Sequence, residues 1–177
     1  LYRAWRNHAA TEGLRVRAGR WNVPGRPTAI LVDFKQFLTR QNEILTEFWK
    51  KFGVDSLTGN WDYRESALFG YAAGRVIESF WRFNLDPADK VVAQFHEWMT
   101  GTGLLYLKAA EIPVATVFTT HATVIGRCIA GNNLPLYDGI LGYDADEKAR
   151  HFNVVARHSL EKKAAQNSDI FTTVSDI

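Results

Sequence analysis

Two kinds of hydrophobic pattern alternate along the second half of the chain, and this alternation constrains the fold more than any other feature. Short apolar runs typical of strands lie at 90–95, 113–118 and 170–174, and the first of them is expected to be a buried strand. Between them, 99–110 and most of 144–167 have the apolar spacing of helices. Strands and helices that alternate through short connections form βαβ crossovers. We therefore predict an α/β fold with a parallel sheet and helices on both faces.

The first half is expected to begin with two strands and a helix. Residues 14–21 alternate in the manner of a half-buried strand, and 29–33 form a short apolar run after the turn-forming sequence NVPGRP. Large apolar side chains recur at helical spacing over 34–52, directly before Gly53. This pattern predicts an amphipathic helix that ends at the glycine.

A second helix is predicted to follow, with Asn60 or Asp62 as its cap and its end near Phe83. Gly70 and Gly74 lie four residues apart on this helix. Since glycine has no side chain, we expect another backbone to pack closely there, and we prefer this interpretation to a ligand contact.

Length and composition are those of one globular domain. The chain has 177 residues, of which 46% are hydrophobic and 23% are charged. The formal net charge is +2, without a dense block of Lys and Arg, so nucleic acid is not an expected partner. The single cysteine, Cys128, cannot form an internal disulfide, which favours the cytoplasm. No apolar run approaches the roughly 20 residues of a spanning helix, so no membrane contact is expected.

Three predicted strands end in polar sequences: HEW at 96–98, TTH at 119–121 and TTVS at 172–175. The carboxyl ends of parallel strands lie at one edge of a sheet, where loops open and helix N-termini offer free N–H groups. We therefore expect these sequences to meet at a single rim, and the rim to be the ligand site.

Local sequence leaves the roles of single rim residues open. His121 is either a catalytic or a structural histidine. A lone histidine is more often structural, but a position at a strand end favours a catalytic role about as strongly, so both roles stay open. Glu97 either contributes to a site or favours the dipole of the following helix. Arg127 either binds a phosphate or is a surface charge.

The common nucleotide-binding, hydrolase and metalloprotease motifs are missing from the sequence. A metal site is not expected, because the remaining histidines are scattered and His158 is predicted to share a polar helix face with Lys162. Arg157 and Glu161 are spaced as a helical ion pair, which predicts a solvated, salt-bridged face.

The polar sequences carry a family resemblance. FHEW at 95–98, FTTHAT at 118–123 with Gly126-Arg127, and FTTVS at 171–175 occur in the order and approximate spacing of the glycogen synthases of the animal and fungal type. Fainter matches, including ALFGY at 67–71, extend the likeness over nearly the whole chain. The chain thus resembles a fragment of the N-terminal domain of that family.

The resemblance implies a glycosyltransferase of the GT-B type, whose two Rossmann-like halves face each other across a cleft. Residues 1–177 would be an incomplete first half, without the donor-binding second domain. The implied reaction transfers glucose from UDP-glucose to the non-reducing end of an α-1,4-glucan, with retention of configuration and without a metal or other cofactor. The implied partners are a nucleotide sugar and glycogen. An incomplete half should be inactive alone, and its uncovered sheet edge should favour a homo-oligomer.

The resemblance also assigns roles to single residues. His121 and Glu97 would be catalytic, with His121 near the C6 hydroxyl of the donor glucose and Glu97 lining the sugar subsite. Arg127, His96 and Thr120 would bind substrate, with Arg127 on the sugar-nucleotide side of the cleft.

Some positions depart from the family pattern. Gln94 replaces a typical His, Cys128 replaces a Tyr, and the loop at 132–143 differs in detail, which suggests a divergent, bacterial member. Two alternatives stay open: a starch-synthase-like enzyme that uses ADP-glucose, and a glucan-binding module without activity.

Overall fold

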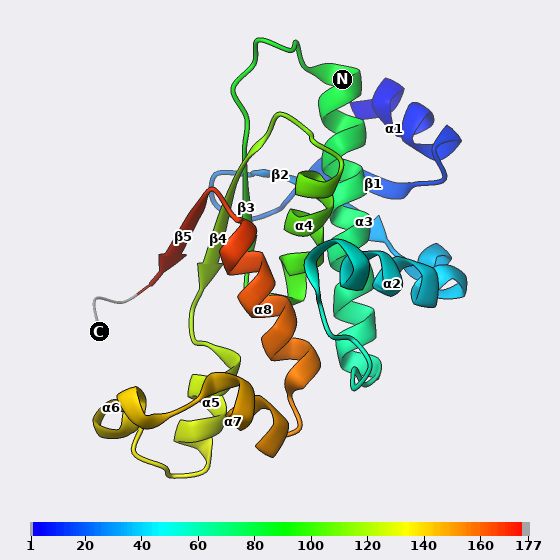
Figure 1. Cartoon of the computed structure of the whole chain (residues 1–177). Helices are drawn as coiled ribbons and strands as arrows, with labels where there is room; N and C mark the ends of the chain where they lie inside the picture. Colours follow the sequence, from blue (N-terminus) through cyan, green and yellow to red (C-terminus); the bar gives the residue numbers. More distant parts are fainter. Residues whose placement is uncertain (1, 175–177) are drawn as a thin grey trace.

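The second half of the chain contributes a three-stranded parallel sheet (Figure 1). In the computed structural model, which describes residues 2–174, the strands are β3 (Val92–His96), β4 (Ala115–Thr120) and β5 (Ile170–Thr173), in the order β3-β4-β5. Their register pairs Phe95 with Phe118 and Phe118 with Phe171. The carboxyl ends of the strands therefore lie at the same edge, as predicted.

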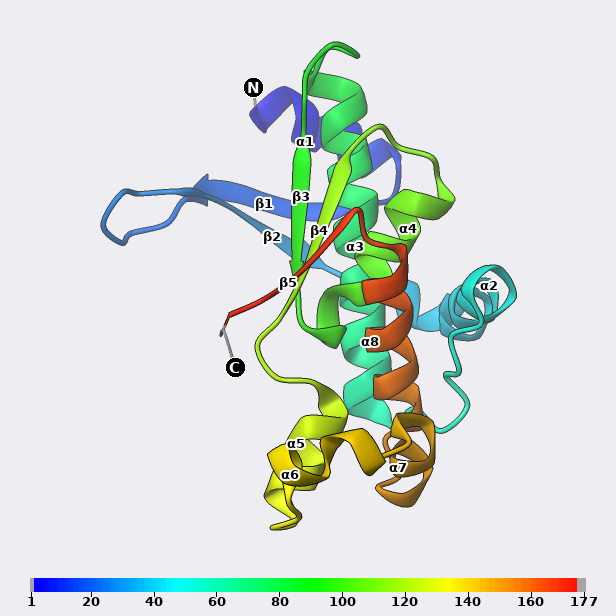
Figure 2. The same ribbon diagram turned by 60° about the vertical axis from the view of Figure 1, so that its left-hand side comes forward.

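Helices α3 (Trp61–Asn84), α4 (Gly101–Ala109) and α8 (Val155–Asn167) lie together on one side of this sheet (Figure 2). The predicted α/β class, with a parallel sheet flanked by helices, is confirmed, although these three helices lie on one face and not on both faces as expected. Strand β3 is half-buried, however, and not buried on both faces as expected: Ala93 and Phe95 are buried, whereas Val92 and Gln94 are exposed.

Glycines allow α3 and α4 to cross closely. A Cβ atom on Gly103 of α4 would lie 2.6 Å from the carbonyl oxygen of Gly70, and one on Gly74 would lie 2.8 Å from the carbonyl oxygen of Gly103. Real Cβ atoms essentially never approach other atoms so closely, so a side chain at either position would push the helices apart. The close backbone approach predicted at Gly70 and Gly74 is confirmed.

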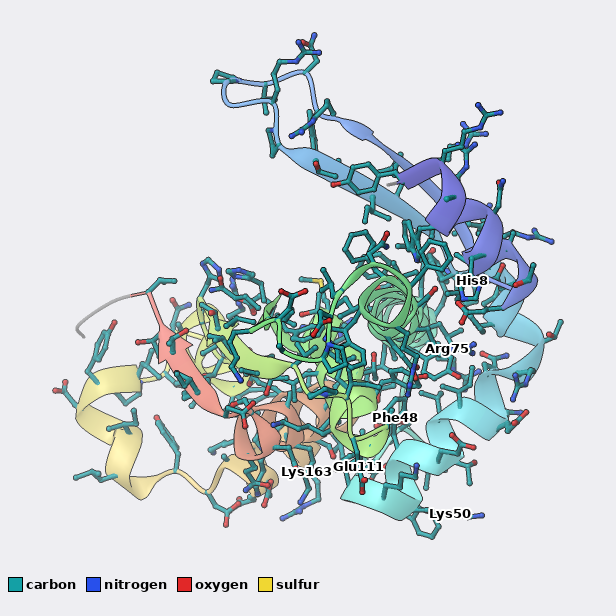
Figure 3. All side chains as sticks on the ribbon, turned by 90° about the horizontal axis from the view of Figure 1, so that it is seen from above. His8, Phe48, Lys50, Arg75, Glu111 and Lys163 are labelled. Carbon is teal, nitrogen blue, oxygen red and sulfur yellow. The ribbon has the colours of Figure 1, made fainter. Side chains whose placement is uncertain are left out.

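The first strands form a separate antiparallel hairpin, β1 (Arg15–Arg20) with β2 (Thr28–Asp33), which extends away from the helices (Figure 3). It follows a helix that the sequence did not predict, α1 (Tyr2–Thr11). Trp5 anchors α1, because its side chain is fully buried and its Nε1 donates a hydrogen bond to Ser79 Oγ at 3.2 Å.

The segment predicted as one helix over 34–52 is divided into a 3₁₀ helix, η1 (Lys35–Arg40), and α2 (Gln41–Phe52). It ends at Gly53 as predicted, because Gly53 has φ +70°, a conformation that glycine adopts without strain. Phe48 of α2 points towards α3, where its ring meets that of Tyr71 (Figure 3). The predicted cap of α3 is also confirmed, since Asn60 accepts a hydrogen bond from the Tyr63 N–H.

Beyond the carboxyl ends of the strands lie α5 (Val124–Gly131), α6 (Leu136–Gly139), η3 (Ile140–Gly142) and α7 (Ala145–His151) (Figure 1). Ile125, Ile129 and Ala149 form a small apolar cluster that joins α5 to α7. The break between α7 and α8 contains Asn153 at φ +55°, so the predicted helical segment 144–167 forms two helices. No helix within residues 2–174 is long and apolar enough to cross a bilayer.

Candidate functional site

The rim at the carboxyl ends of β3 and β4 brings together His96, Glu97 and His121. The Glu97 N–H donates to the carbonyl oxygen of Thr119 at 2.9 Å, which continues the pairing of the two strands one residue past the end of β3. His96 Nδ1 and His121 Nε2 share a hydrogen bond at 3.2 Å, and both imidazoles are exposed. The prediction that the strand-end sequences meet at one rim is confirmed for HEW and TTH.

The Glu97 carboxylate is directed into this rim. Its Oε1 accepts a hydrogen bond from the backbone N–H of His121 at 2.8 Å and lies 3.7 Å from Arg127 Nη2. Only 13% of the Glu97 side chain is exposed, whereas 61% of the Arg127 side chain is exposed. A single carboxylate thus contacts two other residues that the resemblance assigns to the site.

The backbone of Glu97 has φ +62° and ψ +165°, a combination that residues other than glycine rarely adopt. Such a conformation costs on the order of 1–3 kcal/mol and persists only where the surrounding contacts enforce it. At Glu97 those contacts include the bond to Thr119 on the backbone and the bond to His121 on the side chain. The strain marks Glu97 as a residue held in place for a reason other than local stability.

Helix α5 begins directly after the His121 loop and presents Arg127. Thr123 is its N-cap and accepts a hydrogen bond from the Gly126 N–H at 3.0 Å. Arg127 Nε donates to the carbonyl oxygen of Ala122 at 3.3 Å, which ties the arginine to the loop. A mostly exposed guanidinium in the first turn of a helix is well placed for an anion such as a phosphate.

Glu161 of α8 lies next to the site, and not on a solvated face as its spacing from Arg157 predicted. It is 6% exposed, and its Oε2 and Oε1 accept from the Val124 N–H at 3.0 and 3.3 Å. Burial raises the pKa of Glu161 to about 7, with a smaller contribution from Glu97, while the Val124 N–H and Arg127 act in the opposite direction. The sequence signal for this burial was the apolar spacing of Leu160 and Ala164 around it.

The predicted partner of Glu161 points elsewhere. Arg157 lies 3.8 Å from Asp62 and 5.3 Å from the centre of the Trp98 ring. His158 shares a helix face with Lys162 as predicted, since the two side chains bond the carboxylate of Asp146 at 2.8 and 2.7 Å, but His158 is only 9% exposed. Contacts between distant segments thus replaced the local helical pairing that the sequence suggested.

Thr120, assigned to substrate binding, is 3% exposed and lies next to Glu161, where its hydroxyl lowers the pKa of that carboxyl. One residue earlier, Thr119 links all three strands: its hydroxyl accepts from Gln94 Nε2 at 2.9 Å and shares a hydrogen bond with Thr172 at 2.8 Å. The role of Thr120 towards substrate stays a prediction.

The arrangement combines two imidazoles, a guanidinium and two carboxylates around the end of β4. Imidazole and carboxylate groups can exchange hydrogen bonds with sugar hydroxyls, and a guanidinium can contact a diphosphate. Within residues 2–174, no group of three or more His, Cys, Asp or Glu side chains could hold a metal ion.

Comparison with known proteins adds to this geometry. Residues 3–177 match the family model described as Glycogen synthase. The chain is 36% identical over 165 residues to a glycogen [starch] synthase of Dictyostelium discoideum, an alignment that covers 93% of the chain and 18% of the relative. It is 33% identical over 168 residues to isoform 2 of the Saccharomyces cerevisiae enzyme, covering 94% of the chain and 24% of the relative. For the liver enzyme of Mus musculus the identity is 33% over 167 residues, covering 93% and 23%. The chain therefore spans about a fifth to a quarter of the length of these relatives.

Proposed function

Because the chain belongs to the glycogen synthase family, we propose that it forms one wall of the active-site cleft of a longer glucosyltransferase. The proposed reaction transfers glucose from UDP-glucose to the non-reducing end of an α-1,4-glucan, with retention of configuration. The observation that carries this proposal is the convergence of His96, Glu97, His121 and Arg127 at one rim. These are residues for which a family role was expected, and they come from two strand ends and a helix N-terminus.

Each rim residue has a proposed role that suits its chemistry. His121 donates a hydrogen bond from its exposed imidazole to a hydroxyl of the donor glucose, and His96 orients that imidazole through the bond between the two rings. Glu97 lines the sugar subsite and holds the His121 backbone at the same time. Arg127 contacts the diphosphate side of the donor.

Departure of the leaving group places negative charge on the diphosphate and positive character on the glucose ring. Groups that are already oriented towards those charges stabilise the transition state more than the ground state. We propose that fixed cations meet the diphosphate charge without a metal or other cofactor, with Arg127 on this wall and further groups on a second domain. We also propose that the enzyme assembles as a homo-oligomer in the cytoplasm.

The test is transfer of labelled glucose to glycogen by the full-length protein, with UDP-glucose and ADP-glucose compared as donors and EDTA added in parallel. We expect transfer from UDP-glucose that EDTA does not reduce. Preference for ADP-glucose would indicate a starch-synthase-like enzyme, and loss of transfer in EDTA would contradict the metal-free mechanism. Binding of glycogen without transfer from either donor would overturn the enzymatic proposal in favour of a glucan-binding module.

A further inference from the structure

We propose that Glu161 is a positioning residue for the transfer reaction, because its carboxylate fixes the loop between β4 and α5 that carries His121. This inference rests on the proposed function. Glu161 lies on α8, outside the strand-end sequences. The proposed role gives a reason for burying its carboxylate, which is otherwise energetically unfavourable.

The loop at 121–123 is held at both ends by carboxylates from other parts of the chain. At its start, Glu97 accepts from the His121 N–H at 2.8 Å. At its end, Glu161 accepts from the Val124 N–H through both oxygens, at 3.0 and 3.3 Å. A loop anchored at both ends has few conformations left to sample, so the His121 imidazole is kept near one position.

The segments that carry Glu97 and Glu161 are connected by tight packing between α4 and α8. Glu97 lies four residues before Gly101, where α4 begins. A Cβ on Gly101 would lie 3.1 Å from Ala164 Cβ and 3.2 Å from Leu160 Cδ1, so α8 packs tightly against the start of α4. Glu161 lies between those two α8 residues in sequence. The helix that carries Glu161 is therefore packed against the helix that follows Glu97, which keeps the loop ends at a fixed separation.

Stabilisation of α5 alone does not account for Glu161. Thr123 already caps the helix through the Gly126 N–H. A carboxylate that is 6% exposed has lost most of its hydration, which is unfavourable for its charged form. Because Arg127 is tied to the carbonyl oxygen of Ala122, any displacement of the loop moves His121 and Arg127 together. A positioning role explains why the Glu161 carboxylate is buried at the rim although it loses its hydration there.

The experiment measures kcat, KM and melting temperature of the full-length protein for three variants of Glu161. Glu161→Ala removes the contact and is expected to lower kcat by about 10- to 100-fold, with little change in KM for the glucan, since misplacement of reacting groups by about 1 Å can lower a rate by up to about 100-fold. Glu161→Gln keeps an oxygen that accepts from the Val124 N–H, so this variant should retain most of the activity. Glu161→Asp keeps the charge but shortens the reach, so it should behave like Glu161→Ala.

Asp169→Asn is the matched control. Asp169 also accepts a hydrogen bond from a backbone N–H, that of Thr116 at 2.7 Å, but this contact lies at the end of β4 remote from the rim. We expect this variant to lose stability and to keep its kcat. Equal losses of kcat in Asp169→Asn and Glu161→Ala would overturn the proposal, as would normal turnover by the folded fraction of both Glu161→Ala and Glu161→Asp.

Amide hydrogen exchange gives a readout that does not depend on activity. Amides at 121–127 should exchange faster in Glu161→Ala and Glu161→Asp than in the unchanged protein and in Asp169→Asn. If the unchanged protein transfers no glucose, the proposed function fails, and exchange still decides whether Glu161 fixes the loop. Unchanged exchange at 121–127 in both variants would overturn the inference even where the enzyme is active.

Discussion

The backbone N–H of His121 donates a hydrogen bond to Glu97 Oε1 at 2.8 Å, so the two residues assigned to catalysis are held by each other. Glu97 in turn is held in a strained backbone conformation by its bond to Thr119. The position of the His121 imidazole therefore depends on the conformation of a residue 24 positions earlier in the chain. Substitutions at these two positions should not be additive, because each changes the surroundings of the other.

The strain at Glu97 predicts an unusual order of stability between two variants. Both Glu97→Gly and Glu97→Ala lose the carboxylate, but only glycine adopts φ +62° and ψ +165° without strain. We expect the glycine variant to be more stable than the alanine variant by about 1–3 kcal/mol, although alanine is ordinarily the more stabilising residue of the two. Urea denaturation of both variants checks this. An alanine variant as stable as the glycine variant would show that the backbone at Glu97 is not strained.

The close crossing of α3 and α4 predicts a strong effect at Gly103. An added Cβ would lie 2.6 Å from the Gly70 carbonyl oxygen and 2.8 Å from Phe95 Cε1. We expect Gly103→Ala to lower the free energy of unfolding by about 2 kcal/mol or more, because the contact involves backbone atoms that cannot move aside. Gly131→Ala is the control, since a Cβ there has no heavy atom within 4 Å and the melting temperature should change little. Similar melting temperatures for both variants would contradict the described helix crossing.

The buried carboxyl of Glu161 predicts a particular dependence of stability on pH. Its pKa rises from 4.5 in the unfolded chain to about 7 in the folded protein. Between these values the folded state holds a proton that the unfolded state has released, so the contribution of Glu161 to stability is largest below about pH 4.5 and is lost as the pH rises through about 7. The loss amounts to at most about 3 kcal/mol.

Glu161→Gln cannot titrate, so it isolates this effect. The difference in unfolding free energy between the unchanged protein and Glu161→Gln should shift in favour of the glutamine variant between pH 5 and pH 8. Contributions from groups that are the same in both proteins cancel in the difference. Parallel stability curves from pH 5 to pH 8 would show that the carboxyl of Glu161 is not perturbed by burial.

Local sequence signals predicted the parts of the fold that local physics determines. The short apolar runs became the parallel strands, Asn60 capped α3, and Gly53 ended α2. Helix α1 was missed because it has only two buried residues, Trp5 and Ala9, and no long apolar stripe. Its stability comes from contacts such as the one between Trp5 and Ser79, which are 74 residues apart.

The candidate site, too, was predictable where a simple rule of the fold applies and not where contacts between distant residues decide. The rule that ligands bind at the carboxyl ends of parallel strands was sufficient to place His96, Glu97 and His121 together. Glu161 was misassigned because helical spacing pairs it with Arg157, while in the structure Arg157 turns to Asp62 and Trp98. Only the packing of α8 against α4 and α5 reveals the bond between Glu161 and Val124.

The central claim, that this rim takes part in glucose transfer, is tested most directly by measuring kcat and melting temperature of His121→Ala on one preparation of the full-length protein. An oriented contact to the reacting glucose matters most in the transition state, so kcat should fall on the order of 100-fold, with a much smaller effect on glucan binding. Because the His121 side chain is exposed, the melting temperature should change little. A variant that loses stability while its folded fraction keeps normal turnover would show that His121 is structural and would contradict the account.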